Sequence, residues 1–311
     1  MVTEMAMEIL GSSPAITHLL RTLPMIALSE ASVLLEGETG TGKELIAKAL
    51  HLESRRKNKP FVTINCAVLP VERVEVDLFG KGDESGEITH RGRLLAAEGG
   101  TVFFDNVESL PLSIQAKVLR FLEAGECQLQ GHHKLQVVDV RIVAASSADL
   151  QHLVDAGRFR SDLYYRLQVV PLRVPALRDR VDDILMLLRH FGRKFAGNNA
   201  VVRYSKETER CLLTYAWPGN IRELINFCQR MALLNPGKTL QPEDLASEMM
   251  PESGAQSHVF TLPRTGIKLA QVEVDLIEQA LNLSAGNRSK AARLLGISRD
   301  TLLYRMQKHE L

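Results

Sequence analysis

Hydrophobic and polar positions follow two different periods along roughly the first 170 residues. Short apolar runs rich in β-branched and aromatic residues occupy residues 32–36, 61–65, 101–105 and 137–146. Between these runs, apolar residues recur at helical spacing, for example over residues 43–52 and 112–124. Strands that alternate with helices in this way predict βαβ units and a mostly parallel sheet.

The pattern becomes entirely helical from about Arg178. It predicts helices over residues 182–195, 205–215, 221–233 and 242–249. Residues 250–263 carry Pro, Gly and Ser among polar neighbours and are typical of a linker, after which helical spacing returns over residues 268–311. We therefore expect an α/β domain over residues 1–172, a small helical domain over 173–249, and a second all-α domain over 264–311.

Composition narrows the class of protein. The 311 residues are 45% hydrophobic and 24% charged, which indicates a globular chain of two or three domains. No apolar run approaches the roughly 18 residues needed to span a bilayer, and the acidic start of the chain is not a signal peptide. We therefore expect a cytoplasmic protein with no membrane partner. The four cysteines lack C-x-x-C spacing, so buried thiols are expected rather than a zinc site.

The most specific motif directly follows the apolar run at residues 32–36 and directly precedes a predicted helix. It has the G-x-x-x-x-G-K pattern of a P-loop, whose backbone N–H groups and lysine bind phosphates. Glu44 stands where Ser or Thr usually binds magnesium. The alternative is a glycine-rich turn that binds nothing, which the strand–loop–helix context disfavours. The expected nucleotide-binding residues are Gly37, Glu38, Thr39, Gly40, Thr41, Gly42, Lys43 and Glu44.

The apolar run at residues 101–105 ends in Asp105. In P-loop proteins an acid in this place holds the magnesium ion (Mg2+) of the bound nucleotide. A strand that ends in Asp is weak evidence alone, but it is strong evidence after a P-loop. The sequence therefore predicts that the chain binds ATP with Mg2+.

The last helical block predicts a helix-turn-helix. Ala291, Ala292, Leu294 and Leu295 form an apolar face on a short helix, and Gly296 begins a tight turn. Ser298 is a good N-cap for a second helix, since its hydroxyl can accept a backbone N–H. We expect three apolar side chains of the turn and second helix to face the core: Ile297, Leu302 and Met306.

Polar side chains of the second helix then remain available to DNA. Residues 284–311 carry six basic residues against two acids, a local charge of +4 that suggests a polyanionic partner. The N-terminal part of such a helix enters the major groove of double-stranded DNA. The alternative is a helical bundle with a solvated basic face. Base contacts are expected from Arg299 and Thr301, phosphate contacts from Arg305 and Lys308, and Tyr304 also lies outward.

The preceding helix carries an apolar stripe at Val272, Leu276, Ala280 and Leu283. Such a stripe suits dimerisation, and core packing explains it equally well.

Together these segments resemble the AAA+ domain of sigma-54 activators, also called bacterial enhancer-binding proteins, followed by a Fis-type helix-turn-helix. The resemblance covers residues 9–311 and makes Glu44 a normal residue of the loop. It implies an AAA+ P-loop domain with a helical lid over residues 173–249. The motifs that carry it are GETGTGKE (37–44), VTINCA (62–67), LPLSIQAKVLRFLEAGE (110–126), VDVRIVAAS (138–146), GRFRSDLYYRL (157–167), WPGNIREL (217–224) and GNR…AARLLGISR…TL (286–302).

The resemblance also implies roles for single residues. Arg160 and Arg166 match candidate arginine fingers, which reach the nucleotide of a neighbouring subunit in a ring, commonly a hexamer. Arg222 matches a sensor arginine of the lid, and Asn65 matches a switch asparagine. Residues 9–11, with Ile9 and Gly11, match the segment near the adenine. Without the resemblance, these positions are explained by a basic surface, a helix-surface salt bridge, a strand end and apolar packing.

Two departures from the family pattern affect function. No GAFTGA sequence follows Gly80, and only 11 residues separate it from Gly92, fewer than is usual. The loop that grips sigma-54 is therefore expected to be an ordinary surface turn. Asn106 replaces the glutamate that polarises the attacking water. Loss of a general base costs on the order of 10²–10⁴ in rate, although an amide can still orient water.

These observations favour a DNA-binding transcription regulator that uses ATP mainly for assembly or control. The rival interpretation is a true sigma-54-activating ATPase that remodels RNA polymerase holoenzyme. A weaker third is a subunit of a mixed ring with a complete homologue. Only eight residues precede the resemblance, so we expect control by partners, expression level, nucleotide or a domain outside this sequence. The target promoter, the signal, the sigma factor and the sign of the effect stay open.

Overall fold

The computed structural model describes residues 9–70, 72–83, 87–131, 135–250, 268–284 and 286–309. The chain divides into two compact units, Met1–Pro251 and Glu252–Leu311, which are considered separately. Residues 251–263 of the expected linker lie outside the described residues. The described helices include none that is long and apolar enough to cross a membrane.

The first unit contains a five-stranded parallel sheet, as the alternating pattern predicts. Its order is β2-β5-β8-β1-β9. The sequence predicts neither the fifth strand nor the start of β8 at Arg141. Of the residues expected at the beginning of that strand, Val137 belongs instead to a separate hairpin. The fifth strand was missed because Pro171 interrupts its pattern, and proline is tolerated there because β9 pairs only with β1 at the sheet edge. The strands are β1 (Val33–Glu36), β2 (Phe61–Asn65), β5 (Thr101–Asp105), β8 (Arg141–Ser146) and β9 (Val170–Arg173).

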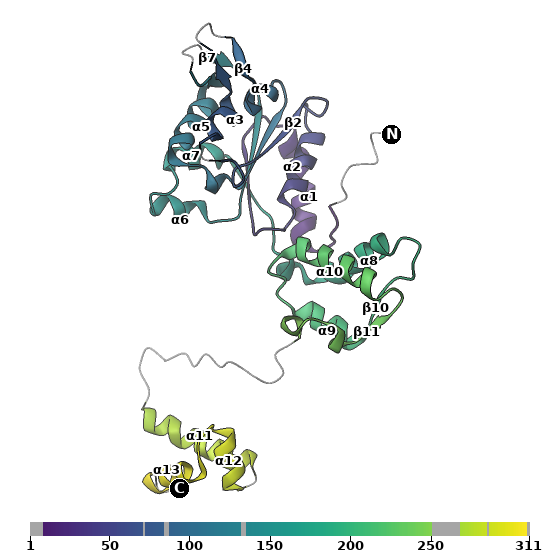
Figure 1. The fold of residues 1–311 in the computed structure, drawn as a ribbon, viewed down its shortest axis with the longest axis vertical. Helices are drawn as coiled ribbons and strands as arrows, with labels where there is room; N and C mark the ends of the chain where they lie inside the picture. Colours follow the sequence, from purple (N-terminus) through teal and green to yellow (C-terminus); the bar gives the residue numbers. More distant parts are fainter. Residues whose placement is uncertain are drawn as a thin grey trace. The chain divides into compact units, whose positions relative to one another are not determined.

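Helices cover both faces of this sheet (Figure 1). Alternate strand residues face opposite sides, so that Leu34 and Phe104 join one buried core while Val33 and Phe103 join the other. Because both faces are buried, the strands are apolar almost throughout. One layer is α1 (Pro14–Ala27) and α2 (Lys43–Leu52); the other includes α3 (Val74–Phe79), α4 (Arg93–Ala96), α5 (Leu112–Ala124), α6 (Leu150–Asp155) and α7 (Ser161–Leu167).

Two short antiparallel hairpins extend this second layer. They are joined through Gly82 N–H, which donates to the Gln130 carbonyl at 3.0 Å, and Gln130 N–H, which donates to the Gly80 carbonyl at 3.0 Å. The hairpins are therefore one connected surface feature. Their strands are β3 (Lys81–Gly82) with β4 (Ile88–His90), and β6 (Glu126–Gln128) with β7 (Leu135–Val137).

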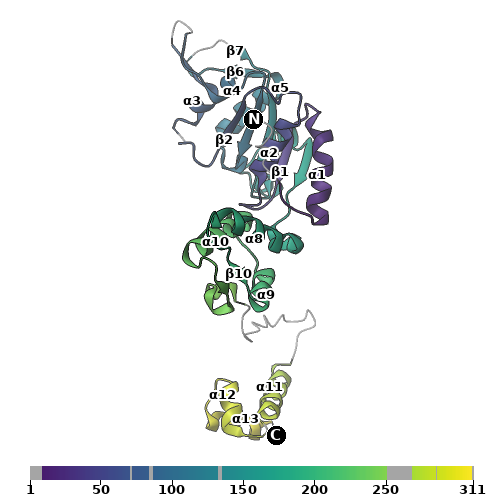
Figure 2. The ribbon, with the colours of Figure 1, turned by 90° about the vertical axis from the view of Figure 1, so that its right-hand side faces the viewer.

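The helical lid follows the sheet in the same unit (Figure 2). Its core surrounds the fully buried Trp217, and α8 packs against α10. The prediction of a helix over 242–249 is wrong. Two short 3-10 turns lie there instead, and the extended residues Leu245 and Ala246 separate them. The elements are η3 (Leu177–Arg180), α8 (Val181–Ala196), β10 (Arg203–Tyr204), α9 (Lys206–Thr214), α10 (Asn220–Leu234), β11 (Thr239–Leu240), η4 (Pro242–Asp244) and η5 (Ser247–Met249).

The second unit is a three-helix fold of α11 (Leu269–Leu283), α12 (Arg288–Leu294) and α13 (Arg299–Lys308). Ser298 caps α13 by accepting the Thr301 N–H, as the sequence predicts. Leu302 and Met306 are buried and Ile297 packs against them, which is also as predicted. The prediction that Leu294 belongs to the buried apolar face is wrong, because its side chain is 60% exposed.

The stripe on α11 divides between two environments. Ala280 is buried, but Leu276 and Leu283 are 49% and 81% exposed. The core position is Ile277, which the predicted stripe did not contain. All four cysteines are buried free thiols, as predicted.

Candidate nucleotide-binding site

The P-loop connects the carboxyl end of β1 to α2. β1 ends at Glu36 and α2 begins at Lys43, which matches the expected strand–loop–helix order. Gly40 and Gly42 have positive φ values of 80° and 100°, a conformation that glycine adopts without steric cost. Thr41 is buried, and its hydroxyl donates to the Glu38 carbonyl at 2.8 Å. The loop is thus folded back on itself around the start of α2.

Lys43 closes this loop from within. Its ammonium donates to the carbonyls of Gly37 at 2.6 Å and Glu38 at 3.0 Å. Burial lowers the pKa of Lys43, while the charges of Asp105 and Glu108 oppose that shift. The side chain therefore places a cation beside the loop's N–H groups, where phosphate oxygens would lie.

Asp105 stands at the carboxyl end of β5, in the same cleft as Lys43. Burial raises its pKa, and the Lys43 charge lowers it. The cleft has a volume of about 340 Å³ and is also lined by Asn106 and Arg222. The described residues contain no cluster of three or more carboxylate, His or Cys groups that could hold a metal alone. A lone carboxylate fits magnesium that is bound jointly with nucleotide phosphates, because Mg2+ usually takes one or two protein carboxylates.

Asn106 follows Asp105 in the left-handed backbone region, with φ 56° and ψ 49°. Asparagine tolerates this region better than most residues. In the amide orientation that satisfies its neighbours, Nδ2 donates to both Asp105 carboxylate oxygens at 3.1 Å. The side chain is therefore bound to the magnesium-ligand candidate and offers no proton acceptor of general-base strength.

The lid contributes to the same cleft through α10. Arg222 lines it with Ile221, and both backbone N–H groups donate to the Gly40 carbonyl, at 3.3 and 3.0 Å. The first turn of a helix has N–H groups without partners inside the helix, and here the P-loop supplies an acceptor for two of them. The structure thus brings the predicted sensor arginine to the P-loop.

The Glu38 side chain is directed at the lid. It pairs with Arg178 and accepts a hydrogen bond from the buried Asn220. Sequence reasoning missed both partners, because 140 and 182 residues separate them from Glu38. Asn220 lies inside the WPGNIREL motif, which was the one feature of the sequence that pointed to this residue.

Of the other predicted nucleotide contacts, Glu44 lines this cleft and Asn65 does not. Asn65 pairs in register with Asp105, and its Oδ1 accepts the Ala67 N–H at 3.0 Å. Glu44 forms an ion pair with Lys48 at 2.7 Å. Ile9 packs on the core beside α1 and α2, and neither Ile9 nor Gly11 lines the cleft. The segment after Gly11 is fixed by Asp183 of α8, which accepts hydrogen bonds from Ser12 and Ser13.

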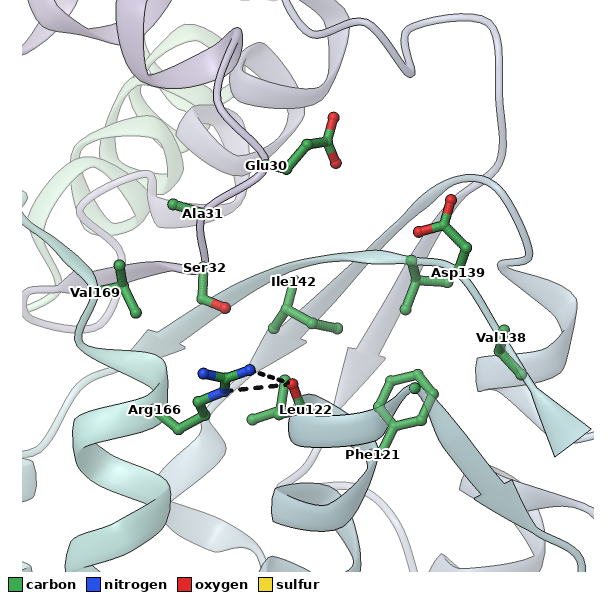
Figure 3. A pocket seen from close by; sticks show the side chains of 12 residues that line it. Glu30, Ala31, Ser32, Phe121, Leu122, Val138, Asp139, Ile142, Arg166 and Val169 are labelled. Carbon is green, nitrogen blue, oxygen red and sulfur yellow. Dashed lines mark hydrogen bonds between the residues drawn. The ribbon is translucent and has the colours of Figure 1, made fainter. Parts of the chain in front are cut away.

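Arg166 lies near the amino ends of the parallel strands, and Figure 3 shows its side chain among the residues that line a cleft there. It lines a cleft of about 380 Å³ with Ser32, Ile142 and Val169, which stand at the amino ends of β1, β8 and β9. Its guanidinium donates to the Leu122 carbonyl at 2.9 and 3.3 Å. Since the P-loop follows the carboxyl end of β1, Arg166 does not meet the P-loop of its own chain.

Arg160 is exposed at the start of α7, close in sequence to Arg166. It forms a two-point ion pair with Asp162, at 2.7 and 3.1 Å. Neither arginine lines the P-loop cleft.

The segment after Gly80, which is expected to replace the sigma-54 contact loop, contains the antiparallel strands β3 and β4. Asp83 N–H donates to the Glu87 carbonyl at 3.0 Å, and Glu87 N–H donates to the Asp83 carboxylate at 2.9 Å. Residues 84–86 of the expected surface turn lie outside the described residues. The two hydrogen bonds join the described residues on either side, Asp83 and Glu87.

The predicted DNA contacts gather on α13. Arg299, Tyr304 and Lys308 are exposed, and Thr301 is half-buried beside Ser298. Arg305 differs, because Glu273 of α11 accepts its hydrogen bond at 2.6 Å and binds His309 at 3.0 Å. These two partners lower the pKa of Glu273, with His309 the larger cause. The positive charge of Arg305 is therefore partly neutralised by Glu273 within the same unit.

The fold and cleft define an AAA+ P-loop module with a lid, joined to a helix-turn-helix. The chain matches the Sigma-54 interaction domain over residues 9–173, the AAA+ ATPase lid domain over 178–260, and the Fis family of bacterial regulatory proteins over 268–309. It belongs to the family of transcription regulators that carry a sigma-54 interaction domain.

Similar proteins agree with this assignment. The regulatory protein AtoC of Escherichia coli K12 is 42% identical over 311 residues, which covers 97% of this chain and 68% of AtoC. ZraR of the same organism is 42% identical over 316 residues, covering 99% and 70%. The crystal structure of NtrX from Brucella abortus in complex with ATP superposes with a TM-score of 0.73 at 32% identity, covering 98% of this chain and 69% of NtrX.

Proposed function

We propose that this chain is a DNA-binding transcription regulator that binds ATP with Mg2+ for assembly or control and does not remodel sigma-54 holoenzyme alone. One observation carries the proposal. Lys43 and Asp105 share one cleft, while Asn106 in that cleft binds Asp105 and cannot serve as a base. Binding groups are thus retained where the group for the chemical step is replaced.

In this proposal the chain's own residues divide the work of binding. Loop N–H groups and Lys43 would hold the nucleotide phosphates, and Arg222 would contribute from the lid. Asp105 would hold magnesium, which when bound neutralises phosphate charge. Asn106 orients water at most, so hydrolysis is slow.

Assembly into a ring supplies the remaining cation. Because Arg166 stands on the edge opposite the P-loop, a head-to-tail contact is needed to bring it to a neighbour's nucleotide. Arg160 is the second candidate for this role, and Asp162 must release it first. We propose closed rings of this kind, hexamers being the family's common form.

The second unit supplies the contact with double-stranded DNA at a promoter or enhancer site. Arg299, Tyr304 and Lys308 present a polar, basic face. Leu269, Leu276 and Leu283 stand seven residues apart on α11 and are each about half or more exposed. Such spacing suits helix pairing between two copies, which supports dimeric DNA binding.

The rival function is full sigma-54 activation, and it is favoured by 42% identity to AtoC and ZraR. Another possibility is a subunit that enters a mixed ring with a complete homologue, which would bring the missing loop. Transcription in vitro with sigma-54 and sigma-70 holoenzymes in parallel separates these functions. Only the rival requires open complexes from this chain alone.

The direct test of nucleotide binding is Lys43→Ala in the full chain. Calorimetry should show ATP binding by the unmodified chain and none by the variant, since the point charge and loop closure are both removed. The far-UV circular dichroism of both should agree. Unchanged ATP affinity in Lys43→Ala would remove the basis of the assignment.

A further inference from the structure

Three side chains connect the P-loop to the lid outside the cleft itself. Glu38 accepts hydrogen bonds from both terminal guanidinium nitrogens of Arg178, one of them at 2.9 Å. The same carboxylate accepts Nδ2 of Asn220 at 3.1 Å. Glu38, Arg178 and Asn220 are called the lid lock below. None of the three lines the cleft beside Lys43 and Asp105.

Asn220 is the centre of the lid lock. It is fully buried and has a positive φ of 52°. Its Nδ2 donates to the Thr39 carbonyl at 3.0 Å as well as to Glu38, and its Oδ1 accepts the Leu177 N–H at 2.8 Å. One side chain thus fixes the P-loop, the segment that leads into the lid, and the start of α10.

The backbone extends the same connection. The Gly40 carbonyl accepts the N–H groups of Ile221 and Arg222. A Cβ added to Gly40 would lie 2.3 Å from the Gly219 carbonyl oxygen, so this approach requires glycine. The P-loop and the N-terminus of α10 are therefore in direct backbone contact.

This arrangement sets the direction of two P-loop N–H groups. In a planar trans peptide, a carbonyl and the N–H of the next residue point in opposite directions. Because the Thr39 and Gly40 carbonyls accept hydrogen bonds from the lid, the N–H groups of Gly40 and Thr41 point away from those lid donors. P-loops bind phosphate through such groups.

We propose that Glu38, Arg178 and Asn220 are positioning residues that hold the lid on the P-loop and so set its affinity for a nucleoside triphosphate without touching the nucleotide. The inference rests on the proposed nucleotide binding. By linkage, a nucleotide that prefers the locked arrangement also stabilises the lid in that position.

The electrostatics of the lid lock favour this role over general stabilisation. Hydrogen bonds from Arg178 and then Asn220 lower the pKa of Glu38 to about 2, so the carboxylate is ionised throughout the neutral range. The Arg178 and Glu38 side chains are 45% and 42% exposed. An exposed pair contributes little to the free energy of unfolding. Its loss is therefore expected to alter lid position more than thermal stability.

The test compares Glu38→Gln, Arg178→Ala and the double variant in the full chain. Two quantities are measured: hydrogen exchange at the Ile221 and Arg222 amides without nucleotide, and the Kd for ATP. Each single change should speed exchange and weaken ATP binding by about fivefold, the lower end of typical coupling between sites. Arg178→Ala should cause no further loss in the Glu38→Gln background, because the ion pair between these two residues is already absent there.

Arg189→Ala is the matched control. Arg189 is an exposed lid arginine paired with Glu209 at 3.8 Å, so the substitution makes the same charge change within the lid. It should leave both readouts unchanged. Additive losses in the double variant, or unmodified exchange and affinity in the single variants, would overturn the inference while the proposed function stood. Absence of ATP binding by the unmodified chain would overturn both.

Discussion

Asn106 differs from glutamate in two ways, in the chemistry of its side chain and in the backbone conformation that it tolerates. Its amide lacks a basic acceptor, and its left-handed backbone suits asparagine better than glutamate. A residue other than Gly, Asn or Asp costs roughly 1–2 kcal/mol in this backbone region. Asparagine at this position therefore provides no general base. The left-handed backbone at residue 106 also makes the substitution Asn106→Glu unfavourable.

Asn106→Glu should raise the steady-state ATPase rate, because a carboxylate restores the general base. The gain should be on the order of 10- to 100-fold, the low end of general-base effects reduced by backbone strain. Asn106→Gln is the matched control, since it has the same length and no base, and should show no gain. Equal rates for the two variants would exclude a base at this position.

The elements show which predictions local patterns allow. The P-loop was predicted correctly because its glycines, lysine and flanking strand lie within a dozen residues of sequence. β9 was missed because Pro171 obscured an edge strand, and the expected helix at 242–249 is broken by extended residues. Neither the Asn220–Glu38 contact nor the Arg305–Glu273 pair follows from a local period. Such contacts require the tertiary fold.

The predictions for α13 follow from the different positions of its basic residues. Arg299→Ala should relax sequence preference at one or two base pairs, because it stands at the N-terminal end of the helix that enters the groove. Lys308→Ala should weaken all sequences alike and reduce the salt slope by about 1. Binding titrations at several salt concentrations, with specific and scrambled DNA, distinguish these outcomes. Sequence-dependent loss in Lys308→Ala would contradict the docking proposed for α13.

In the proposed ring, the two halves of one ATPase site lie on different chains. Arg166 stands on the amino edge of the sheet and Lys43 on the carboxyl edge. The rotation that brings one edge to the other in a neighbour can repeat until the ring closes.

Mixing two variants tests this arrangement. In the Asn106→Glu background, Lys43→Ala and Arg166→Ala chains should each lack ATPase activity. Equal mixtures should recover a fraction of the rate, because some interfaces join an intact P-loop to an intact Arg166. Arg160→Ala in place of Arg166→Ala shows which arginine acts. An Arg166→Ala chain as active as its parent would exclude that residue as the finger.

The central claim is that this chain retains ATP binding but not the ability to remodel sigma-54 holoenzyme. The most direct measurement is open-complex formation on a sigma-54 promoter with a binding site for the chain, with ATP saturating and a complete family member as positive control. We expect none by the unmodified chain, and none by Asn106→Glu, because residues 81–90 contain no GAFTGA sequence. Robust open-complex formation by the unmodified chain alone would contradict the account and establish the sigma-54-activating ATPase.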